Sequence, residues 1–385
     1  MSRLLYIANA RMPNEKAHGY QIAQMCEAFA LAGEDVTLVV PRSVNEPDLR
    51  GIDDIWTYYG IRQNFRLVRL PCLDLIWRLD NQFAFMLQSV SFIVALLVWM
   101  LFHRFDRIFS RDHLVMAVLS PVTSRRKLIY EVHGKFRSRR GLRFQVWLLR
   151  RVGKVVSLTG SMAHQLSEMG AENVLIAHDG VRPERFENEN NPNLSQTDLG
   201  LRFPEDAFVA CYAGRLHSMG MSKGLDTFIE AAAKTKNIVF LLVGGPDEDV
   251  QKLREKWIML GLPPQDFHTV GTVPAADVPR YLAAADVCLI PSPHNEFFAY
   301  ESSPMKLFEY MFAGRAIIAS DLPAIREIVR HGESAYLVPP SDVDALAVAL
   351  QTLRDDPALR EKLGIAAKKE AMQYTWEARA RRILA

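Results

Sequence analysis

The sequence has few cysteines, and none of them forms a pattern that binds metal or builds a disulfide framework. Its 385 residues include only Cys26, Cys72, Cys211 and Cys288, which lie far apart and form no CxxC pair. Cys211 and Cys288 stand inside apolar runs, so we expect buried thiols of a cytoplasmic protein. The N-terminal MSRLLYIANA has an apolar run too short for a signal peptide, which favours the same compartment.

Two nucleotide-binding signatures are also missing. No GxGxxG follows the first predicted strand, which argues against a dinucleotide-dependent oxidoreductase, and no Walker A loop is present. The net charge is only +2, so the chain as a whole gives no reason to expect a polyanionic partner. Its hydrophobic content of 49% and charged content of 23% are ordinary for a soluble globular protein.

What the sequence does contain is a long alternation of short apolar runs and amphipathic segments. LLYIANA, AHGYQIAQMCEAFALAG and DVTLVV show it in the first half, and AFVACYAGRL and IVFLLVGG show it in the second. This alternation predicts parallel sheets with helices on both faces. The polar stretch ENENNPNLSQTDLG, residues 187–200, indicates a linker. We therefore predict an α/β protein of two doubly wound domains, 1–190 and 191–365, facing a central ligand cleft, with a helical segment at 366–385.

The stretch ESSPMKLFEYMFAG, residues 301–314, places two acids in a segment that otherwise has the pattern of a buried helix. Ser303 and Pro304 are expected to be its N-cap and first helical residue. The free amides of the first turn attract phosphate, whereas carboxylates suit sugar hydroxyls, which are donors. Glu301, in the loop before the helix, would therefore take a sugar ring, and Glu309 in the second turn a ribose.

Cations follow the first strand of the second domain, in YAGRLHSMGMSKGLDTFIEA. Arg215 comes after an Ala-Gly turn, and Lys223 precedes a helix, where the dipole disfavours a cation unless a ligand compensates. Both would stabilise the charge that grows on a diphosphate leaving group as a glycosidic bond breaks. Because they supply positive charge, we expect no essential metal. The acids at 247–249 and 342–344 match Asp-x-Asp, but they stand at expected helix starts and suit capping.

On these residues the chain resembles the retaining GT-B glycosyltransferases of the family 4 type, the group 1 glycosyl transferases. Glu301 and Glu309 have the family's Glu-x7-Glu spacing, and SPMKLFEYMFAGRAIIASDLPAIREIV is similar to a subgroup that reads SPxKLFEYMAxGxPVVASDLP. The likeness spans nearly the whole second domain and is weaker in the first. One departure is Ser-Ser-Pro at 302–304, where many members have Gly-Phe-Gly. The resemblance implies a GT-B fold whose C-terminal helical segment, 366–385, crosses back to the first domain.

The resemblance also implies which residues act on the donor. The expected catalytic residues are His133, which would face the donor sugar from the first domain, and Arg215, Lys223 and Glu301. The expected donor-binding residues are Gly19, Gly214, Arg215, Lys223, Gly244, Val273, Glu301, Pro304, Met305, Lys306, Leu307 and Glu309. Transfer from a UDP- or GDP-linked sugar with retention of anomeric configuration is implied, with no cofactor and no enzyme nucleophile.

The first domain has an uneven distribution of charge. Residues 103–154 hold 14 arginines or lysines and three acids, a net charge of +11, and the 20 residues before them, 83–102, hold no charge. This apolar run is long enough to span a membrane, but the strands on its two sides should share one sheet. A buried helix and a helix in the membrane interface both stay open. The second suits a lipid-linked acceptor, for which the expected contacts are Arg137, Arg139, Arg140 and Arg143.

The sequence therefore predicts a cytoplasmic glycosyltransferase of cell-surface polysaccharide or glycolipid synthesis, peripheral on the inner face of the membrane if the interface alternative holds. One alternative is a sugar-nucleotide epimerase or phosphorylase of the same fold, which the spelling of 301–320 disfavours. A second is a non-catalytic sugar-nucleotide-binding subunit of a membrane glycan assembly, which Glu309, Arg215 and Lys223 disfavour. Nucleic-acid binding through 103–154 is a third alternative, and salt-dependent binding to DNA would support it.

Overall fold

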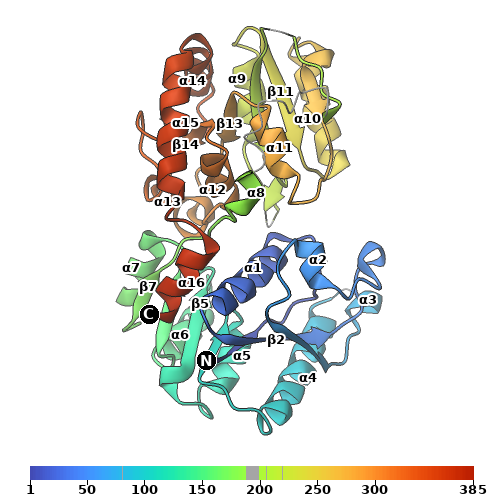
Figure 1. The fold of residues 1–385 in the computed structure, drawn as a ribbon, viewed down its shortest axis with the longest axis vertical. Helices are drawn as coiled ribbons and strands as arrows, with labels where there is room; N and C mark the ends of the chain where they lie inside the picture. The colour runs from blue at the N-terminus through green and yellow to red at the C-terminus, as the bar shows by residue number, and fades with distance from the viewer. Residues whose placement is uncertain (80, 188–198, 205, 219) are drawn as a thin grey trace. The chain divides into compact units, whose positions relative to one another are not determined.

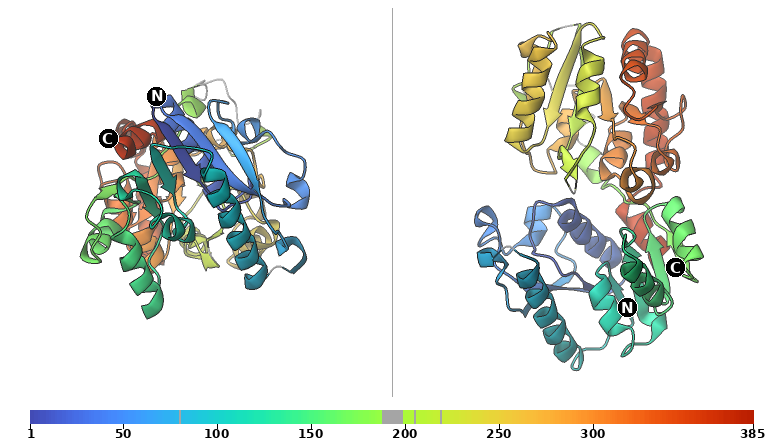
Figure 2. Two further views of the ribbon diagram at one scale, coloured as in Figure 1. Left: turned by 90° about the horizontal axis from the view of Figure 1, so that it is seen from below. Right: turned by 180° about the vertical axis from the view of Figure 1, so that it is seen from behind.

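The protein is described by a computed structural model that covers residues 1–385 except 80, 188–198, 205 and 219. The chain divides into two compact units, the first unit (Met1–His178 with Trp376–Ala385) and the second unit (Asp179–Thr375). Each unit has its own parallel sheet and its own hydrophobic core, as the alternation of strands and helices predicts (Figure 1 and Figure 2).

The first unit is built on a seven-stranded parallel sheet in the order β3-β2-β1-β4-β5-β6-β7. Its strands are β1 (Arg3–Ile7), β2 (Asp35–Arg42), β3 (Arg66–Pro71), β4 (Arg107–Ser110), β5 (Leu128–Val132), β6 (Lys154–Ser157) and β7 (Val174–Ile176). Residues 4–7 of β1 are fully buried, as expected for a strand covered by helices on both faces.

Helices cover both faces of this sheet. On one face α1 (Ala17–Leu31) packs against α16 (Trp376–Leu384) and α2 (Ile55–Tyr59). The other face carries α4 (Gln82–Met100), α5 (His113–Leu119), α6 (Arg139–Leu149) and α7 (Gly160–Glu168), which share one core (Figure 1). A short helix, α3 (Ile76–Leu79), precedes α4 and packs against it.

The second unit is built on a six-stranded parallel sheet in the order β12-β11-β8-β13-β14-β15. Its strands are β8 (Phe208–Ala213), β11 (Ile238–Val243), β12 (Phe267–Thr269), β13 (Val287–Ile290), β14 (Ala316–Ser320) and β15 (Tyr336–Val338). The helices around it are α8 (Glu184–Glu187), α9 (Leu225–Ala232), α10 (Asp247–Met259), α11 (Val278–Ala283), α12 (Met305–Phe312), α13 (Pro323–Arg326), α14 (Val343–Asp355) and α15 (Pro357–Ala371). A small antiparallel pair, β9 (His217–Ser218) and β10 (Met221–Ser222), follows β8.

The borders between the units differ from the predicted ones at residues 190 and 365. The linker predicted at 187–200 lies outside the described residues over 188–198, and the chain already enters the second unit at Asp179. Val181 and Phe186 explain the difference, because both are buried in the core of the second unit. At the other border α15 packs against α12 and β14, so the C-terminal segment of the first unit begins at Trp376 and not at 366.

Helix α4 corresponds to the uncharged run 83–102. Phe92 and Leu96 on one side are fully buried in the core of the first unit, so α4 is a layer of this unit. The other side is exposed: Phe83, Met86, Val90, Val94 and Val98 each keep 54–60% of their surface accessible. The alternative that this run forms a fully buried helix is therefore wrong. By length and composition α4 is long and apolar enough to cross a bilayer, and 33% of its most apolar stretch is buried.

Candidate active site

Glu301 and Glu309 lie on either side of a helix start in the second unit. Glu301 is the last residue of a π-helix, η6 (Phe297–Glu301), and only 5% of its surface is exposed. The Ser302 N–H donates to the Phe297 carbonyl at 2.9 Å and closes this turn. Glu301 thus ends a helical turn, which corrects the prediction that it lies in a loop. Glu309 stands in the second turn of α12, as predicted.

The start of α12 differs from the prediction by one residue. Pro304 is its N-cap and not its first helical residue. The Ser303 Oγ does not cap α12, because it accepts the backbone N–H of Asp179 at 3.0 Å where the chain enters the second unit. In the described part of the chain no capping side chain accepts from the first-turn N–H groups of this eight-residue helix. Such a helix start favours an anion.

Glu309 has a protein partner that the sequence did not indicate. Its Oε1 accepts from Arg185 Nη1 at 3.0 Å, and both side chains are largely buried. Arg185 belongs to α8, and it also donates to the Ala275 carbonyl. The ion pair fixes the carboxylate of Glu309 and leaves its second oxygen for another donor group, such as a hydroxyl.

Two glycines allow the loops after β8 and β11 to meet. Gly214 and Gly244 have φ values of +123° and +135°, which L side chains rarely adopt. A Cβ on Gly244 would overlap the Gly214 carbonyl oxygen, so the two loops touch through backbone atoms. Nothing larger than glycine fits this approach, and both glycines were predicted here.

Three cations gather around the Gly214 turn. Lys306 Nζ lies 3.5 Å from the centre of the Tyr212 ring and next to Gly214. Burial, and then the charge of Lys223, hold the pKa of Lys306 well below its usual value. Burial and then the charge of Arg215 lower the pKa of Lys223 to about 8. Tyr212 also fixes the turn, because its hydroxyl donates to the Arg215 carbonyl at 2.8 Å.

No carboxylate of the described chain forms an ion pair with this cluster, although the charge of Glu309 acts to raise the pKa of Lys306. Among the residues that the structure describes, none places an acidic oxygen within 4.0 Å of the side-chain nitrogens of Arg215, Lys223 or Lys306. The Lys306 Nζ is buried, and within the described chain it has no hydrogen-bond partner. Burying a lysine amine without a hydrogen-bond partner is costly. The presence of Lys306 at this place therefore points to a ligand that supplies negative charge.

The remaining donor positions divide into two kinds. Pro304, Met305 and Val273 are partly exposed, so they can contact a ligand. Leu307 cannot, because its side chain is fully buried in the core and its N–H donates to the Pro304 carbonyl at 2.9 Å. Leu307 is a core residue, which corrects its assignment to the donor site.

The Asp-x-Asp strings act within the protein. Asp342 caps α14 and accepts the Ala345 N–H at 2.9 Å. Asp247 stands in the first turn of α10 and does not cap it, since Pro246 is the N-cap. Asp249 lies in the same turn and accepts from His217 Nδ1 at 2.9 Å. The string at 342–344 therefore caps its helix as predicted, whereas the prediction of capping is wrong for 247–249, whose acids lie in the first turn of α10.

His133 follows β5 in the first unit and has a buried acid beside it. Its Nε2 lies 2.5 Å from Glu131 Oε1, and 26% of its side chain is exposed. Burial, and then the charge of Arg111, lower the pKa of His133 to about 4, against the opposite effect of Glu131. The imidazole is therefore neutral at physiological pH and can hydrogen-bond a hydroxyl as donor or acceptor.

The other predicted residues of the first unit have simple surroundings. Gly19 lies inside α1, and a Cβ there would overlap the side chains of Asn14 and Tyr59. Gly19 is needed for this packing, which corrects its placement in a donor-binding loop. The four arginines predicted to meet the acceptor are all exposed at the start of α6 or just before it, namely Arg137, Arg139, Arg140 and Arg143.

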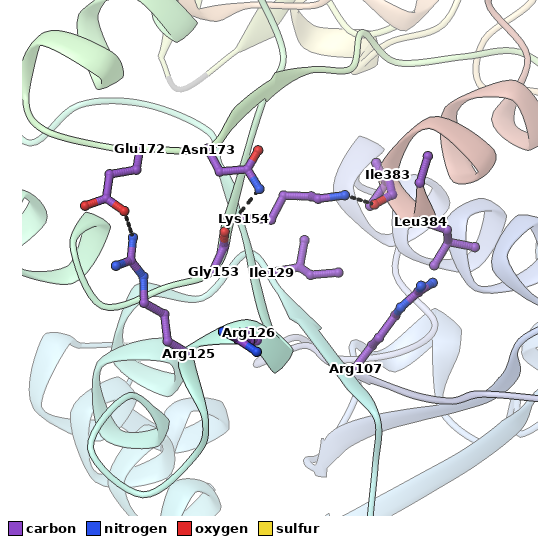
Figure 3. Close-up of a pocket in the computed structure, with 11 residues that line it drawn as sticks. Arg107, Arg125, Arg126, Ile129, Gly153, Lys154, Glu172, Asn173, Ile383 and Leu384 are labelled. Carbon is purple, nitrogen blue, oxygen red and sulfur yellow. Dashed lines mark hydrogen bonds and ion pairs between the residues drawn. The ribbon is translucent and has the colours of Figure 1, made fainter.

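The first unit also contains a pocket of about 460 Å³ at the amino ends of β5 and β6, the opposite sheet edge from His133 (Figure 3). Three of its four cations are used inside the protein. Arg125 pairs with Glu172 at 2.6 Å, and Lys154 Nζ donates to the Ile383 carbonyl at 2.9 Å. Arg107 pairs with Glu34 at 3.0 Å. The fourth, Arg126, is exposed. The pocket therefore lacks the buried cation without an acid partner that marks the second unit.

Glu131, Arg379 and Arg185 are site residues that the sequence analysis missed. Glu131 had a signal, because it is an acid in the middle of the apolar run KLIYEVH. Arg379 and Arg185 had none, since each is one arginine in a polar stretch. Their partners lie 248 and 124 residues away in the sequence, Glu131 for the first and Glu309 for the second.

Comparison with known proteins shows a family likeness for part of the chain. Residues 207–356 match the model of the family "Glycosyl transferases group 1". A D-inositol 3-phosphate glycosyltransferase of Thermomonospora curvata is 29% identical over 256 residues, which cover 60% of this chain and 56% of that protein. The chain thus spans about half the length of the curated relatives that it matches.

Solved structures resemble the whole chain. A sucrose-phosphate synthase of Thermosynechococcus elongatus has a TM-score of 0.78 at 21% identity, over 99% of this chain and 97% of that one. Anabaena HepE in complex with UDP has a TM-score of 0.75 at 19% identity, over 100% and 98%. At this identity the likeness concerns the fold, and the predicted GT-B fold is confirmed.

Proposed function

We propose that this chain is a group 1 glycosyl transferase that moves a sugar from a nucleotide-diphosphate sugar to a glycan or lipid-linked acceptor. The match of residues 207–356 to that family supports the proposal. The donor half of this proposal rests on the second unit, where the family match lies. The acceptor half rests on the surface of the first unit. Retention of anomeric configuration and independence of metal complete the proposal.

The observation that carries it is a group of three cations with which no acid of the described chain forms an ion pair. Arg215, Lys223 and Lys306 surround the Gly214 turn, and two of them have a pKa lowered by burial and by a neighbouring cation. A diphosphate brings the negative charge that this group lacks. The uncapped start of α12 adds N–H donors and the positive end of its dipole. Neutral ligands would leave the repulsion in place.

Each group then has a role in the transfer. Arg215, Lys223 and Lys306 bind the diphosphate and stabilise the charge that accumulates as the bond to the sugar breaks. The second oxygen of Glu309, held by Arg185, accepts from a ribose hydroxyl. Glu301, buried at the end of its turn, accepts from the transferred sugar. This charge stabilisation is the task that a metal ion performs in other transferases, so we propose that none is required.

The nucleotide is UDP or GDP in this proposal. The UDP complex of Anabaena HepE supports UDP as the first to test, because that protein shares the fold. The loops after β11 and β12, at Gly244 and Val273, are the places for contact with the nucleoside. We propose that backbone groups of these two loops contact the base.

The acceptor side of the proposal involves an anionic membrane surface on the cytoplasmic face. The exposed side of α4 carries Phe83, Met86, Val90, Val94 and Val98 in successive turns. The adjacent helices α5 and α6 cover the same sheet face, and the α6 segment carries the four exposed arginines defined above. Apolar side chains with neighbouring arginines suit the headgroup region of an anionic bilayer. A lipid-linked acceptor would be reached from there.

Thermal unfolding with a panel of ligands tests the donor. The panel is UDP, GDP, ADP, dTDP and NAD, measured with wild type, Arg215→Ala and the control Lys234→Ala. Lys234 is an exposed lysine of the same unit that pairs with Asp344 at 2.5 Å. We expect one nucleoside diphosphate to raise the unfolding temperature of wild type and of the control, and not of Arg215→Ala. No shift with any diphosphate would refute the donor proposal.

Two further measurements test the rest. With the donor identified, NMR of the product gives the anomeric configuration, and activity after treatment with EDTA gives the metal requirement. Inversion, or loss of activity that Mg²⁺ or Mn²⁺ restores, would contradict the proposal. For the membrane, flotation with vesicles containing phosphatidylglycerol should be lost in Val94→Asp. It should persist in Val348→Asp, an equally exposed valine (55%) in the second unit.

A further inference from the structure

The first unit contains a fully buried ion pair between its sheet and its C-terminal helix. Arg379 of α16 donates from Nη2 to Glu131 Oε2 at 2.7 Å. Only 2% of the Arg379 side chain and 1% of the Glu131 side chain are exposed. Glu131 lies in β5, and its other oxygen contacts His133 Nε2 at 2.5 Å and Gln21 Nε2 at 3.3 Å. One carboxylate therefore joins α16 to the histidine.

The same arginine holds the segment where the chain leaves the first unit. Arg379 Nε donates to the carbonyls of Ala177 and His178, at 3.2 and 3.0 Å. His178 is the last residue before the second unit, and Trp376, three positions before Arg379, is the first after it. The guanidinium of Arg379 on α16 thus contacts the segment that leaves the first unit and also β5, the strand just before His133.

We infer that Arg379 and Glu131 are positioning residues for His133, so that the returning helix α16 sets the orientation and protonation of this histidine during sugar transfer. The inference rests on the proposed function only in giving His133 a part in the reaction. The Glu131 carboxylate, held by Arg379, accepts a hydrogen bond from the N–H at Nε2 of His133. This leaves Nδ1 as the acceptor, and in the described chain no protein group hydrogen-bonds to it.

The charges around the pair agree with this arrangement. Burial would raise the pKa of Glu131, but Arg379 and His133 outweigh it and hold the pKa well below its usual range. The groups that face His133 and Glu131 come from four elements. They are Tyr6 of β1, His18 and Gln21 of α1, Arg111 after β4 and Arg379 of α16. Arg111 is itself engaged, since its Nη1 donates to Gln21 Oε1 at 2.6 Å.

A purely structural role does not require this chemistry. Well-packed apolar residues can replace a buried ion pair without loss of stability, so the pair is poorly explained by stability alone. Its location next to the partly exposed imidazole of His133, at the carboxyl end of β5, gives it a different purpose. Ionised Glu131 fixes the tautomer of the His133 ring. Arg379 keeps Glu131 ionised and also disfavours the protonated form of His133.

The test is the pKa of His133 in two variants that remove opposite charges. Arg379→Met removes a cation, so NMR titration of ¹³C-labelled histidines should show the pKa of His133 rising above its value of about 4. Glu131→Gln removes an anion, so the same signal should move in the opposite direction. The His133→Gln spectrum identifies the signal. Arg381→Met, on the exposed face of α16, should leave the titration unchanged.

Activity supplies the second readout. In Arg379→Met and in the charge-neutral double variant Arg379→Met with Glu131→Gln, we expect kcat to fall at least tenfold while the KM for the donor stays within twofold. The double variant serves if a single variant does not fold, because it leaves no unpaired buried charge. Shifts of the His133 pKa in the same direction in both single variants, or an unchanged kcat in the double variant, would overturn the inference.

These outcomes stay separate from those of the proposed function. Stabilisation by UDP or GDP depends on the second unit and should persist in every variant of this pair. If no nucleoside diphosphate stabilises wild type, the transferase proposal fails, while the two opposite pKa shifts can still be observed. If stabilisation is present but the pKa does not move, only the positioning role fails.

Discussion

The two units use charge in opposite ways. In the first unit the buried ions Glu131 and Arg379 are paired, and three of the four cations around its pocket have protein partners. In the second unit Arg215, Lys223 and Lys306 gather with no acid within ion-pair distance among the described residues. Paired charges hold a framework in place. A cluster of cations without ion-pair partners in a folded protein instead indicates a site for an anionic ligand. Substitutions should therefore affect the two groups with opposite signs.

The largest effect should come from breaking the buried pair. Arg379→Met leaves the carboxylate of Glu131 buried without its cation, so we expect a loss of about 3–5 kcal/mol in the free energy of unfolding. Urea denaturation of the unit's cooperative transition measures it. The matched control is Arg381→Met, whose ion pair with Glu377 is exposed and should matter by less than about 1 kcal/mol. An equal loss in both variants would mean that helix propensity, not the buried pair, is responsible.

The opposite sign is expected at the unpaired cluster. Lys306→Met removes a buried ammonium that has no hydrogen-bond partner in the described chain and keeps the shape of the side chain. The ligand-free protein should become more stable, by about 1–2 kcal/mol, since the desolvation penalty disappears. Sugar transfer should fall roughly 100-fold, as when one donor to a developing anion is removed.

Thermal unfolding and kcat/KM report these two effects on the same protein. Lys234→Met provides the control, because its partner Asp344 is exposed and neither lies near the cluster. A variant of Lys306 that loses both stability and activity would show that this lysine serves the fold, and it would remove the contrast between the units.

The sequence was sufficient for the fold, whereas the donor contacts of the predicted site residues stay a prediction. The apolar runs LLYIANA, DVTLVV, AFVACYAGRL and IVFLLVGG correspond to β1, β2, β8 and β11. The positions of Arg215, Lys223, Gly214 and Gly244 followed from their place after strands. These features are local, because a strand, a turn glycine or a helix start depends on a few neighbouring residues.

What the sequence did not provide depends on partners far along the chain. Ser303 has the residue type of an N-cap, but Asp179 uses its hydroxyl. Leu307 stands in the donor motif but faces the core. The pairs Glu131 with Arg379 and Glu309 with Arg185 join residues 248 and 124 positions apart, and no spacing rule connects them. The border at Asp179 likewise depends on two apolar side chains that enter the second core.

A smaller effect concerns pH. Burial and Arg215 lower the pKa of Lys223 to about 8 in the ligand-free protein, and a bound diphosphate would raise it again. The protonated lysine binds better, so affinity is complete below the ligand-free pKa and declines above pH 8, by up to about tenfold per pH unit for one proton. Titration calorimetry with the stabilising diphosphate between pH 7 and 10 measures the decline.

Lys223→Arg sharpens this prediction, because a guanidinium keeps its charge over the whole range. The decline should become shallower by up to one tenfold step per pH unit, and Lys306, whose pKa is also lowered, accounts for what is left. Lys234→Arg is the control and should not alter the profile. An affinity that stays constant from pH 7 to 10 in wild type would mean that no lysine releases its proton in the site.

The smallest effect should be found on the outer surface of the first unit. Each arginine near an anionic bilayer contributes about 1 kcal/mol, so Arg140→Ala should weaken binding to phosphatidylglycerol vesicles about fivefold at low salt. Arg382→Ala removes an exposed charge from α16, which packs on α1 at the other sheet face, and should leave vesicle binding unchanged. Equal weakening in both variants would show that net charge, rather than the α4–α6 surface, attracts the protein to membranes.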